Sequence, residues 1–220
     1  MLKLYGFSVS NYYNVVKAAL LEKGIEFEEV RVYPASGQQE LLALSPMGKV
    51  PYLETPQGPV SESQVMLDYL EDLQPEPNLY PTDAFARAKV RELLRVIELY
   101  LELPARRLYP EAFFGGKVSE QTKEEVRPAL EQGVAALLRL ARFEPFIAGN
   151  SFSYADLAAV IHLPLVRDAG KRIYGEELLA PLPDLAGYLQ RIRQRASLQR
   201  VLADYKQELD GFLKRRNAPA

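Results

Sequence analysis

The chain has 220 residues, of which 48% are hydrophobic, so it can bury the core of one large domain or of two ordinary ones. Lysine and arginine total 27 against 29 for aspartate and glutamate, and this near balance, with no run of either sign, gives no indication of a nucleic-acid or membrane partner. Cysteine is absent and His162 is the only histidine, which disfavours redox pairs, thiolate nucleophiles and metal sites.

The N-terminal segment predicts a βαβ unit. Residues 2–7 favour a short strand, residues 15–24 (VVKAALLEKG) a helix that ends at Gly24, and residues 26–33 (EFEEVRVY) a second strand. Because a single helix connects the strands, they should be parallel, with a right-handed crossover. No apolar run is long enough for a signal peptide or a membrane span, so we expect a cytoplasmic protein.

The following residues complete an α/β domain. Residues 38–45 favour a short helix, VPYLE and the segment around Val60 flank TPQG as a hairpin, and residues 62–73 have apolar positions at helical spacing. PEPNLYPTDA then has three prolines in ten residues, which is typical of a linker. We therefore predict an N-terminal βαβαββα domain over residues 1–77 and a linker over residues 78–85.

The remaining residues, 86–220, have an almost entirely helical pattern. They predict an all-α domain with long helices in AKVRELLRVIELYLEL, EEVRPALEQGVAALLRLARF and SYADLAAVIHLPLV, and two more beyond Pro183. Pro104, Pro110 and Pro164 lie inside or beside these patterns, where each is expected to kink or end its helix.

The stretch MGKVPYLETPQGPVSES suggests a binding site for a small carboxylate. Extended chain at Val50 that is not paired within the sheet offers its N–H and C=O groups to a guest. Glu62 and Ser63 fall where the last strand gives way to a helix, so free N–H groups and a hydroxyl point at one spot. A simpler interpretation, compatible with the first, is that Ser61 or Ser63 caps the helix.

These residues resemble the cytosolic glutathione transferases. The resemblance rests on GKVPYLE, on ES at a helix start and on the N-terminal LYGFSVSNYYNVVKAALLEKG, and it continues in GNSFSYADLAAV, where Ser153 and Asp156 form a capping pair. It covers nearly the whole chain. It implies a thioredoxin-like N-terminal domain followed by a helical domain, glutathione as co-substrate, no metal, and a homodimer.

The resemblance also implies roles for individual residues. The bond before Pro51 would be cis, the main chain of Val50 would pair with the cysteinyl part of glutathione, and Glu62 and Ser63 would hold its γ-glutamyl group. Lys49 would meet the glycine carboxylate.

A thiol of ordinary pKa, about 8.5, is only slightly ionised at neutral pH, so the enzyme must stabilise the thiolate. Ser10, just before the first helix, matches the serine-type pattern best, and Asn11 could donate a second hydrogen bond. Tyr5, Tyr12 and Tyr13 remain rivals, and Ser10 could instead be an ordinary helix cap. The family often has proline or a second serine after the catalytic serine, where this chain has Asn11.

An electrophile pocket is expected between the two domains. It would be lined by aromatic and basic side chains, which suit an apolar or an acidic substrate. The candidates are Tyr12, Tyr100, Arg106, Arg107, Tyr109, Phe113 and Phe114.

Three functions remain open from the sequence. The first is a transferase that conjugates glutathione to a small electrophile, or an isomerase of the same superfamily, because both use a similar serine. The second is a non-enzymatic binding protein with the same fold, which the intact Lys49, Val50, Pro51, Glu62 and Ser63 disfavour. The third is a disulfide reductase that needs two glutathiones in one site.

Overall fold

The computed structural model describes residues 1–34 and 39–216. By contacts between Cα atoms the chain divides into two compact units. The first, which we call the N-terminal unit, contains Met1–Leu79 and Gln194–Ala220, and the second, the helical unit, contains Tyr80–Arg193.

A four-stranded mixed sheet forms the centre of the N-terminal unit, with the order β2-β1-β3-β4. Its strands are β1 (Leu2–Gly6), β2 (Phe27–Arg31), β3 (Tyr52–Thr55) and β4 (Gly58–Ser61). The two strands of the βαβ unit are parallel, as predicted, and β3 runs antiparallel to both of its neighbours. The registers pair Tyr5 with Tyr52 and Tyr52 with Ser61, so the end of β1, the start of β3 and the end of β4 lie at the same end of the sheet.

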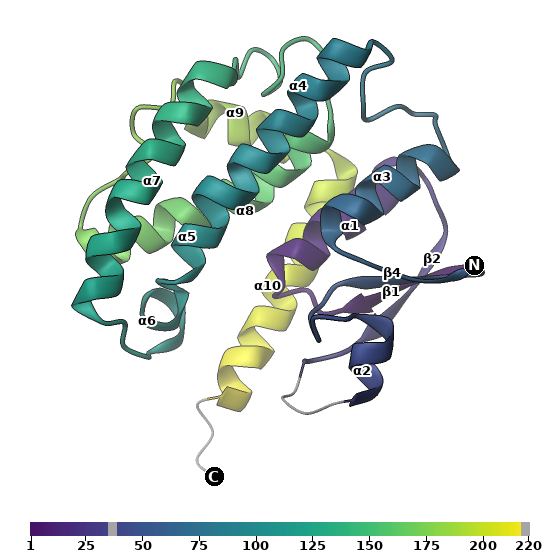
Figure 1. Ribbon diagram of the computed structural model, residues 1–220, viewed down its shortest axis with the longest axis horizontal. Coiled ribbons are helices and arrows are strands. Elements are labelled where there is room, and N and C mark those ends of the chain that lie inside the picture. The colour runs from purple at the N-terminus through teal and green to yellow at the C-terminus, as the bar shows by residue number, and fades with distance from the viewer. Residues whose placement is uncertain (35–38, 217–220) are drawn as a thin grey trace. The chain divides into compact units, whose positions relative to one another are not determined.

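Helices cover both faces of this sheet. Figure 1 shows α1 (Asn11–Glu22) and α3 (Ser63–Leu73) on one face and α2 (Gln39–Leu44) on the other. Leu4, Leu53 and Met66 are fully buried between the sheet and its helices. The βαβαββα order confirms the predicted thioredoxin-like fold. Gln38, the first residue of the second predicted helix, lies outside the described residues.

The last helix, α10 (Ala196–Arg216), groups with the N-terminal unit because it packs against α1. The sequence placed it in the domain 86–220 because its pattern is helical, and helical pattern alone does not say which neighbour covers the apolar face. Several polar pairs join it to the N-terminal residues, such as Asp204 with Lys17, at 2.7 Å. The spatial grouping thus differs from the predicted division of the chain at its C-terminal end.

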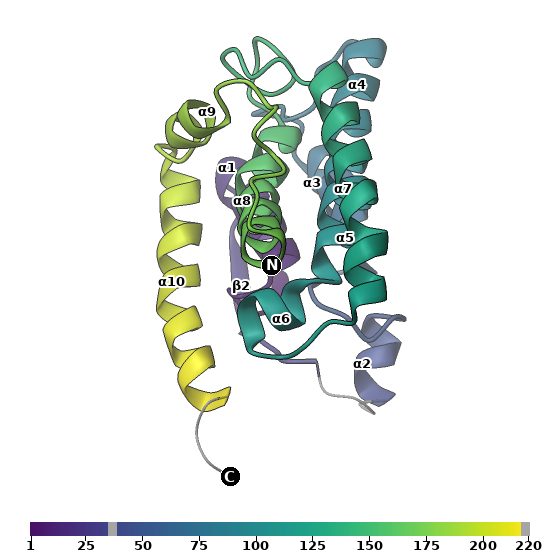
Figure 2. The same cartoon turned by 90° about the vertical axis from the view of Figure 1, so that its left-hand side faces the viewer.

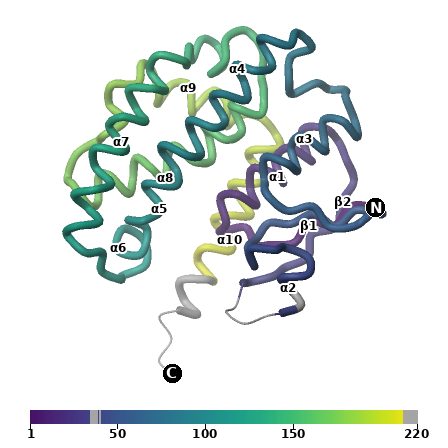
Figure 3. Tube along the Cα trace, in the orientation of Figure 1, coloured from purple at the N-terminus to yellow at the C-terminus, as the bar shows by residue number. Residues whose placement is uncertain are grey.

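The helical unit has the expected all-α architecture. Figure 2 shows α4, α7 and α8 running side by side, and Figure 3 shows the chain continuing from α4 into α5 as one rod. Its elements are α4 (Ala84–Arg95), a π-helical segment η1 (Val96–Glu102), α5 (Leu103–Arg106), α6 (Tyr109–Phe114), α7 (Glu120–Leu140), α8 (Tyr154–Tyr174) and α9 (Leu185–Ile192).

The three prolines singled out in the sequence occupy different places in the helices of the helical unit. Pro110 lies in the first turn of α6, where the missing N–H group has no intrahelical partner to lose. Pro104 lies at the start of α5, which directly follows the π-helical segment η1. Pro164 lies inside α8, which continues to Tyr174. Over residues 1–34 and 39–216, none of the helices is both long and apolar enough to span a lipid bilayer.

Candidate functional site

The start of α3 has an unusual backbone. Between the end of β4 and Ser63, Glu62 has φ 67° and ψ 114°, a left-handed φ that residues with a side chain rarely adopt. The Glu62 side chain is exposed and makes no capping hydrogen bond to the helix. The N–H groups of the first turn, which have no intrahelical acceptors, therefore lack this cap, and Ser63 sits beside them with 9% of its surface exposed. Strain of this kind is retained mainly where it serves a site.

The segment before β3 leaves main-chain groups open. Pairing between β1 and β3 begins at Tyr52, and within the described parts of the chain neither the N–H nor the C=O of Val50 bonds to another main-chain group. Val50 is half-buried, its bond to Pro51 is cis, and Pro51 is buried. Lys49 is exposed, and its N–H donates to the hydroxyl of Ser45 at 3.2 Å.

Ser10 begins α1 at the same end of the sheet. It is the N-cap residue, and its hydroxyl oxygen accepts the N–H of Tyr13 over a long 3.4 Å. Accepting this bond leaves the hydroxyl proton able to be donated elsewhere. Asn11 follows as the first helical residue and is 5% exposed. Because the end of β1, the start of β3 and the end of β4 lie at this end of the sheet, the structure brings Ser10, Val50 and Ser63 there as well.

Two of the rival tyrosines direct their hydroxyl protons at carboxylates. The Tyr5 hydroxyl donates to Glu54, a hydrogen bond that together with burial raises the pKa of Tyr5 to about 12. Tyr13 is buried and donates to Glu29 at 2.6 Å, so burial and then this bond raise its pKa far above the usual value. Neither hydroxyl is arranged to donate to a thiolate. Tyr12, next in the helix, is half-buried.

Four predicted pocket residues of the helical unit lie together: Arg106, Tyr109, Phe113 and Phe114, whose ring centre is 6.3 Å from that of Phe113. The guanidinium of Arg106 stands 5.5 Å from the ring centre of Tyr109, which packs edge-on to Phe113 at 5.1 Å. Arg106 also donates to the buried Glu102 at 2.6 Å. Burial lowers the pKa of the neighbouring His162 to about 4, opposed by Glu102, in agreement with a packed, neutral histidine.

The other two predicted pocket residues of this unit, Arg107 and Tyr100, have other surroundings. Arg107 pairs with Glu125 at 2.6 Å. Tyr100 belongs to η1, and its side chain is 54% exposed. Gly133 of α7 approaches the main chain of Tyr100 so closely that an added Cβ would lie 2.2 Å from its carbonyl oxygen.

The serine–acid pair at the start of α8 is closed upon itself. Asp156 is fully buried and accepts hydrogen bonds from the N–H groups of Ser153 and Ile147, from the Ser153 hydroxyl and from the Tyr188 hydroxyl, at 2.8 to 3.0 Å. The capping box predicted from the sequence is present. No acceptor of Asp156 is left for a ligand, so this pair holds the fold.

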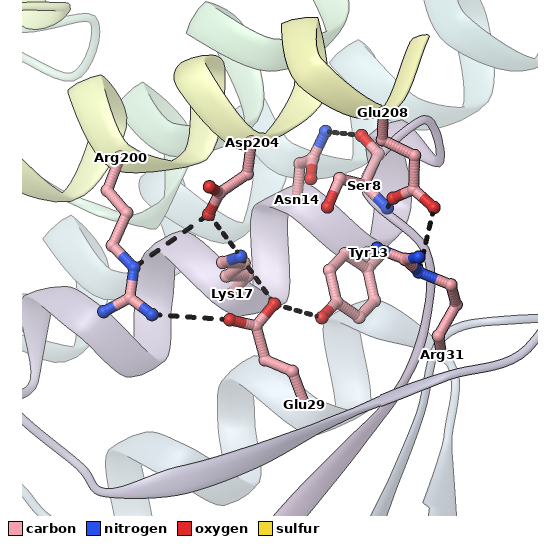
Figure 4. A network of polar contacts seen from close by, with 9 residues as sticks. All are labelled: Ser8, Tyr13, Asn14, Lys17, Glu29, Arg31, Arg200, Asp204 and Glu208. Carbon is pink, nitrogen blue, oxygen red and sulfur yellow. Dashed lines mark hydrogen bonds and ion pairs between the residues drawn. The ribbon is translucent and has the colours of Figure 1, made fainter. Parts of the chain in front are cut away.

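Sequence reasoning missed a charged network where α10 meets α1 and β2 (Figure 4). Glu208 accepts the N–H of Ser8 at 2.6 Å, although the two residues are 200 positions apart. Nearby, Lys17 is buried and pairs with Glu29 and Asp204. The network borders a cavity of about 450 Å³. The only sequence signal for it is a lysine inside the otherwise apolar run VVKAALL.

Comparison with known sequences identifies two domains of one family. The Glutathione S-transferase N-terminal domain matches residues 4–78, and the corresponding C-terminal domain matches residues 120–191. A glutathione S-transferase from Pseudomonas putida is 47% identical over 213 residues, which cover 97% of this chain and 96% of that protein.

Solved structures give the same result. Human glutathione S-transferase T1-1 in its apo form is 26% identical, has a TM-score of 0.76, and is matched over 100% of this chain and 92% of its own. A glutathione S-transferase from Methylobacterium radiotolerans, in complex with glutathione sulfonate, is 25% identical with a TM-score of 0.74, over 91% of this chain and 93% of its own. The sequence relationship and the two-part fold together show that this chain belongs to the glutathione S-transferase family.

Proposed function

We propose that the chain binds glutathione at the end of the sheet where Ser10, Val50 and Ser63 lie, ionises its thiol, and conjugates it to a small electrophile. The observation that carries the proposal is the start of α3, where Glu62 has a strained backbone and no capping bond. A helix start of this kind offers N–H groups to a carboxylate.

Each part of the tripeptide has a matching group. The α-carboxylate of the γ-glutamyl end meets the N–H groups and hydroxyl at Ser63, and its ammonium meets the exposed Glu62 carboxylate. The unpaired main chain of Val50 pairs with the cysteinyl residue, in the way that an added strand pairs with a sheet. Lys49, which is exposed, meets the glycine carboxylate. The glutathione sulfonate bound to the Methylobacterium relative supports this ligand.

We assign thiol activation to Ser10, with Asn11 as the second donor. A hydroxyl that donates to sulfur favours the thiolate over the thiol, and the positive end of α1 acts in the same direction. The thiolate then attacks the electrophilic carbon, a C–S bond forms, and the leaving group departs with its electron pair. The hydroxyls of Tyr5 and Tyr13 already donate to carboxylates, which favours Ser10 over these two tyrosines as the residue that activates the thiol.

The electrophile is assigned to the aromatic and basic side chains predicted for it in the helical unit: Tyr100, Arg106, Arg107, Tyr109 and Phe113. The packed group of Arg106, Tyr109 and Phe113 favours a substrate with an apolar or aromatic body. The ion pair between Arg106 and Glu102 reduces the support for an acidic substrate, because the guanidinium already has an anion beside it.

We also propose a cytoplasmic homodimer. Large apolar side chains such as Val65, Phe85 and Leu103 are exposed on the single chain, and a second copy would cover such residues. Sedimentation at micromolar concentration should give the mass of a dimer, and a monomer mass would reject this part of the proposal.

The thiol titration of Ser10→Ala tests the activation step. The variant keeps Val50 and Ser63 and should still bind glutathione, but it loses a hydrogen bond to a charged group worth about 1.5 to 3 kcal/mol. The pKa of the bound thiol should therefore rise by about one to two units, and turnover at neutral pH should fall about ten- to a hundredfold. Thiolate absorbance in the ultraviolet, followed against pH, measures the shift. Overlying titrations would reduce Ser10 to a helix cap.

A panel of electrophiles, assayed with and without glutathione, separates the candidate reactions. Conjugation of at least one compound is expected. An isomerase would instead convert an unsaturated acid or ketone while regenerating glutathione. Failure of the whole panel by a protein that binds glutathione would favour a binding role.

A further inference from the structure

The peptide of Ser8, in the loop between β1 and α1, is held from two sides by buried side chains (Figure 4). Its N–H donates to the Glu208 carboxylate at 2.6 Å, and its carbonyl accepts the side-chain amide of Asn14 at 2.8 Å. Glu208 is 8% and Asn14 is 4% exposed. A loop peptide with both groups bound to buried side chains has little freedom to shift.

The constraint on Ser8 also acts on Ser10, because both residues belong to one turn. The N–H of Ser10 donates to the carbonyl of Phe7 at 3.0 Å, which closes a turn around Ser8. The ring of Phe7 packs on Tyr33 at 4.9 Å, and the Tyr33 hydroxyl donates to Glu208 at 2.6 Å. Glu208 is therefore bonded directly to one residue of the turn and through Tyr33 to another.

The hydrogen bond from the Ser8 N–H to Glu208 is charge-assisted. Burial raises the pKa of Glu208, but hydrogen bonds from Tyr33 and Ser8 and the charge of Arg31, whose Nε lies 3.2 Å from the carboxylate, outweigh it and hold this pKa below its usual value. Glu208 is thus ionised at neutral pH. Hydrogen bonds to an ionised acceptor are about twice as strong as neutral ones, which suits a residue that must fix a loop.

We propose that Glu208 is a positioning residue for thiol activation: it holds the Ser8 peptide and thereby sets the place of the Ser10 hydroxyl. This inference rests on the proposed role of Ser10. It makes the C-terminal helix part of the apparatus that ionises glutathione. Glu208 acts through Ser8 and takes no part in the reaction itself.

Asp204 provides a matched comparison for this role. It lies one turn earlier on α10 and also carries a carboxylate that binds α1, through Lys17 at 2.7 Å. Its partners are Lys17 and Arg200, neither of which belongs to the turn Phe7–Ser10. If carboxylates of α10 serve only to attach the helix, removing either one should have the same kind of effect.

The experiment compares Glu208→Ala, Glu208→Gln and Asp204→Ala in the full-length protein, alone and combined with Ser10→Ala. The measurements are the pKa of bound glutathione, kcat and KM against pH, and denaturant unfolding. Glu208→Ala should raise the bound-thiol pKa by about one unit and lower kcat at neutral pH about tenfold, with recovery at high pH and little change in KM. Glu208→Gln retains a neutral acceptor for the Ser8 N–H, so its shift should be smaller.

Asp204→Ala should lower the midpoint of unfolding and leave the bound-thiol pKa unchanged. In the Ser10→Ala background, Glu208→Ala should add no further pKa shift, because both changes remove the same interaction. Should Glu208→Ala not fold, Glu208→Gln carries the test.

The outcomes distinguish failure of this inference from failure of the proposed function. If Ser10→Ala shifts the pKa and folded Glu208 variants do not, or if Asp204→Ala shifts it equally, only the positioning role is overturned. If Ser10→Ala itself gives no shift, Ser10 is not the activator, and the assignment of activation to Ser10 falls together with the positioning role of Glu208.

Discussion

Helices α3 and α8 both begin beside a serine and an acid, yet the two pairs are used in opposite ways. At α8 the acid follows the serine and turns back on it, and Asp156 is buried with four hydrogen bonds. At α3 the acid precedes the serine, and Glu62 faces outward from a left-handed backbone with no bond to the helix.

The contrast teaches how to separate a cap from a binding site when the residue types are the same. A cap satisfies the first N–H groups of its helix from within the chain, and its acid disappears from the surface. A binding site leaves these groups for a ligand and keeps its acid exposed, at the expense of backbone strain. On this criterion Asp156 serves stability, and the criterion supports our proposal that Glu62 and Ser63 recognise the ligand.

The largest effect is expected from Asp156→Ala. The change leaves the N–H groups of Ser153 and Ile147 and the Tyr188 hydroxyl buried without an acceptor, and each such group costs about 1 to 3 kcal/mol. Denaturant unfolding should therefore show a loss of more than about 3 kcal/mol. Asp156→Asn keeps acceptor oxygen at the same place and should lose less. A loss below about 0.5 kcal/mol, the size typical of a surface substitution, would show that the closed pair is not a stabilising cap.

Ser63→Ala should weaken glutathione binding and leave stability nearly unchanged, in contrast to Asp156→Ala. The Glu62 residue, not Ser63, occupies the cap position of α3, so removing the hydroxyl should change stability by less than about 0.5 kcal/mol. Glutathione should bind about ten- to a hundredfold more weakly, because a hydrogen bond to a carboxylate is lost. A fluorescence titration with glutathione measures the affinity, with Ser61→Ala as control. Unchanged affinity together with a lower unfolding midpoint would make Ser63 an ordinary helix-stabilising residue.

Glu62→Gly should change stability in the opposite direction to Asp156→Ala. Glycine adopts φ near +67° without steric cost, so the variant should gain up to about 1 kcal/mol in free energy of unfolding. It should also bind glutathione more weakly, because the carboxylate is gone. Glu62→Gln keeps the backbone conformation and removes only the charge, which separates the two effects. A variant that is stabilised and binds glutathione unchanged would show that the strain serves no ligand.

Much of the fold could be predicted because it is encoded locally. Alternation in residues 26–33, helical spacing after Glu62 and the turn chemistry of TPQG give the strands and helices in their correct order. The capping box is likewise a spacing of three residues, read directly from Ser153 and Asp156. Predictions that depend on neighbours within a few residues succeeded.

Predictions that depend on distant partners were harder. A helical pattern shows that α10 is a helix, but not that it packs on α1, and nothing in the sequence joins Glu208 to Ser8 across 200 positions. Similarly, the tyrosines near Ser10 could not be separated from it until Tyr5 and Tyr13 were found to donate to Glu54 and Glu29. The left-handed conformation of Glu62 has no local signal, because the position has a side chain where glycine is the usual residue.

The central claim is that the end of the sheet at Ser10, Val50 and Ser63 is a glutathione site. A calorimetric titration tests it most directly. The wild-type protein is titrated with glutathione and, in parallel, with the dipeptide Cys-Gly, which has the same thiol and glycine end but lacks the γ-glutamyl group. The account predicts saturable binding of glutathione at one site per chain and much weaker binding of the dipeptide, because the start of α3 recognises the missing group. No saturable heat at millimolar glutathione, or equal affinity for the two ligands, would contradict it.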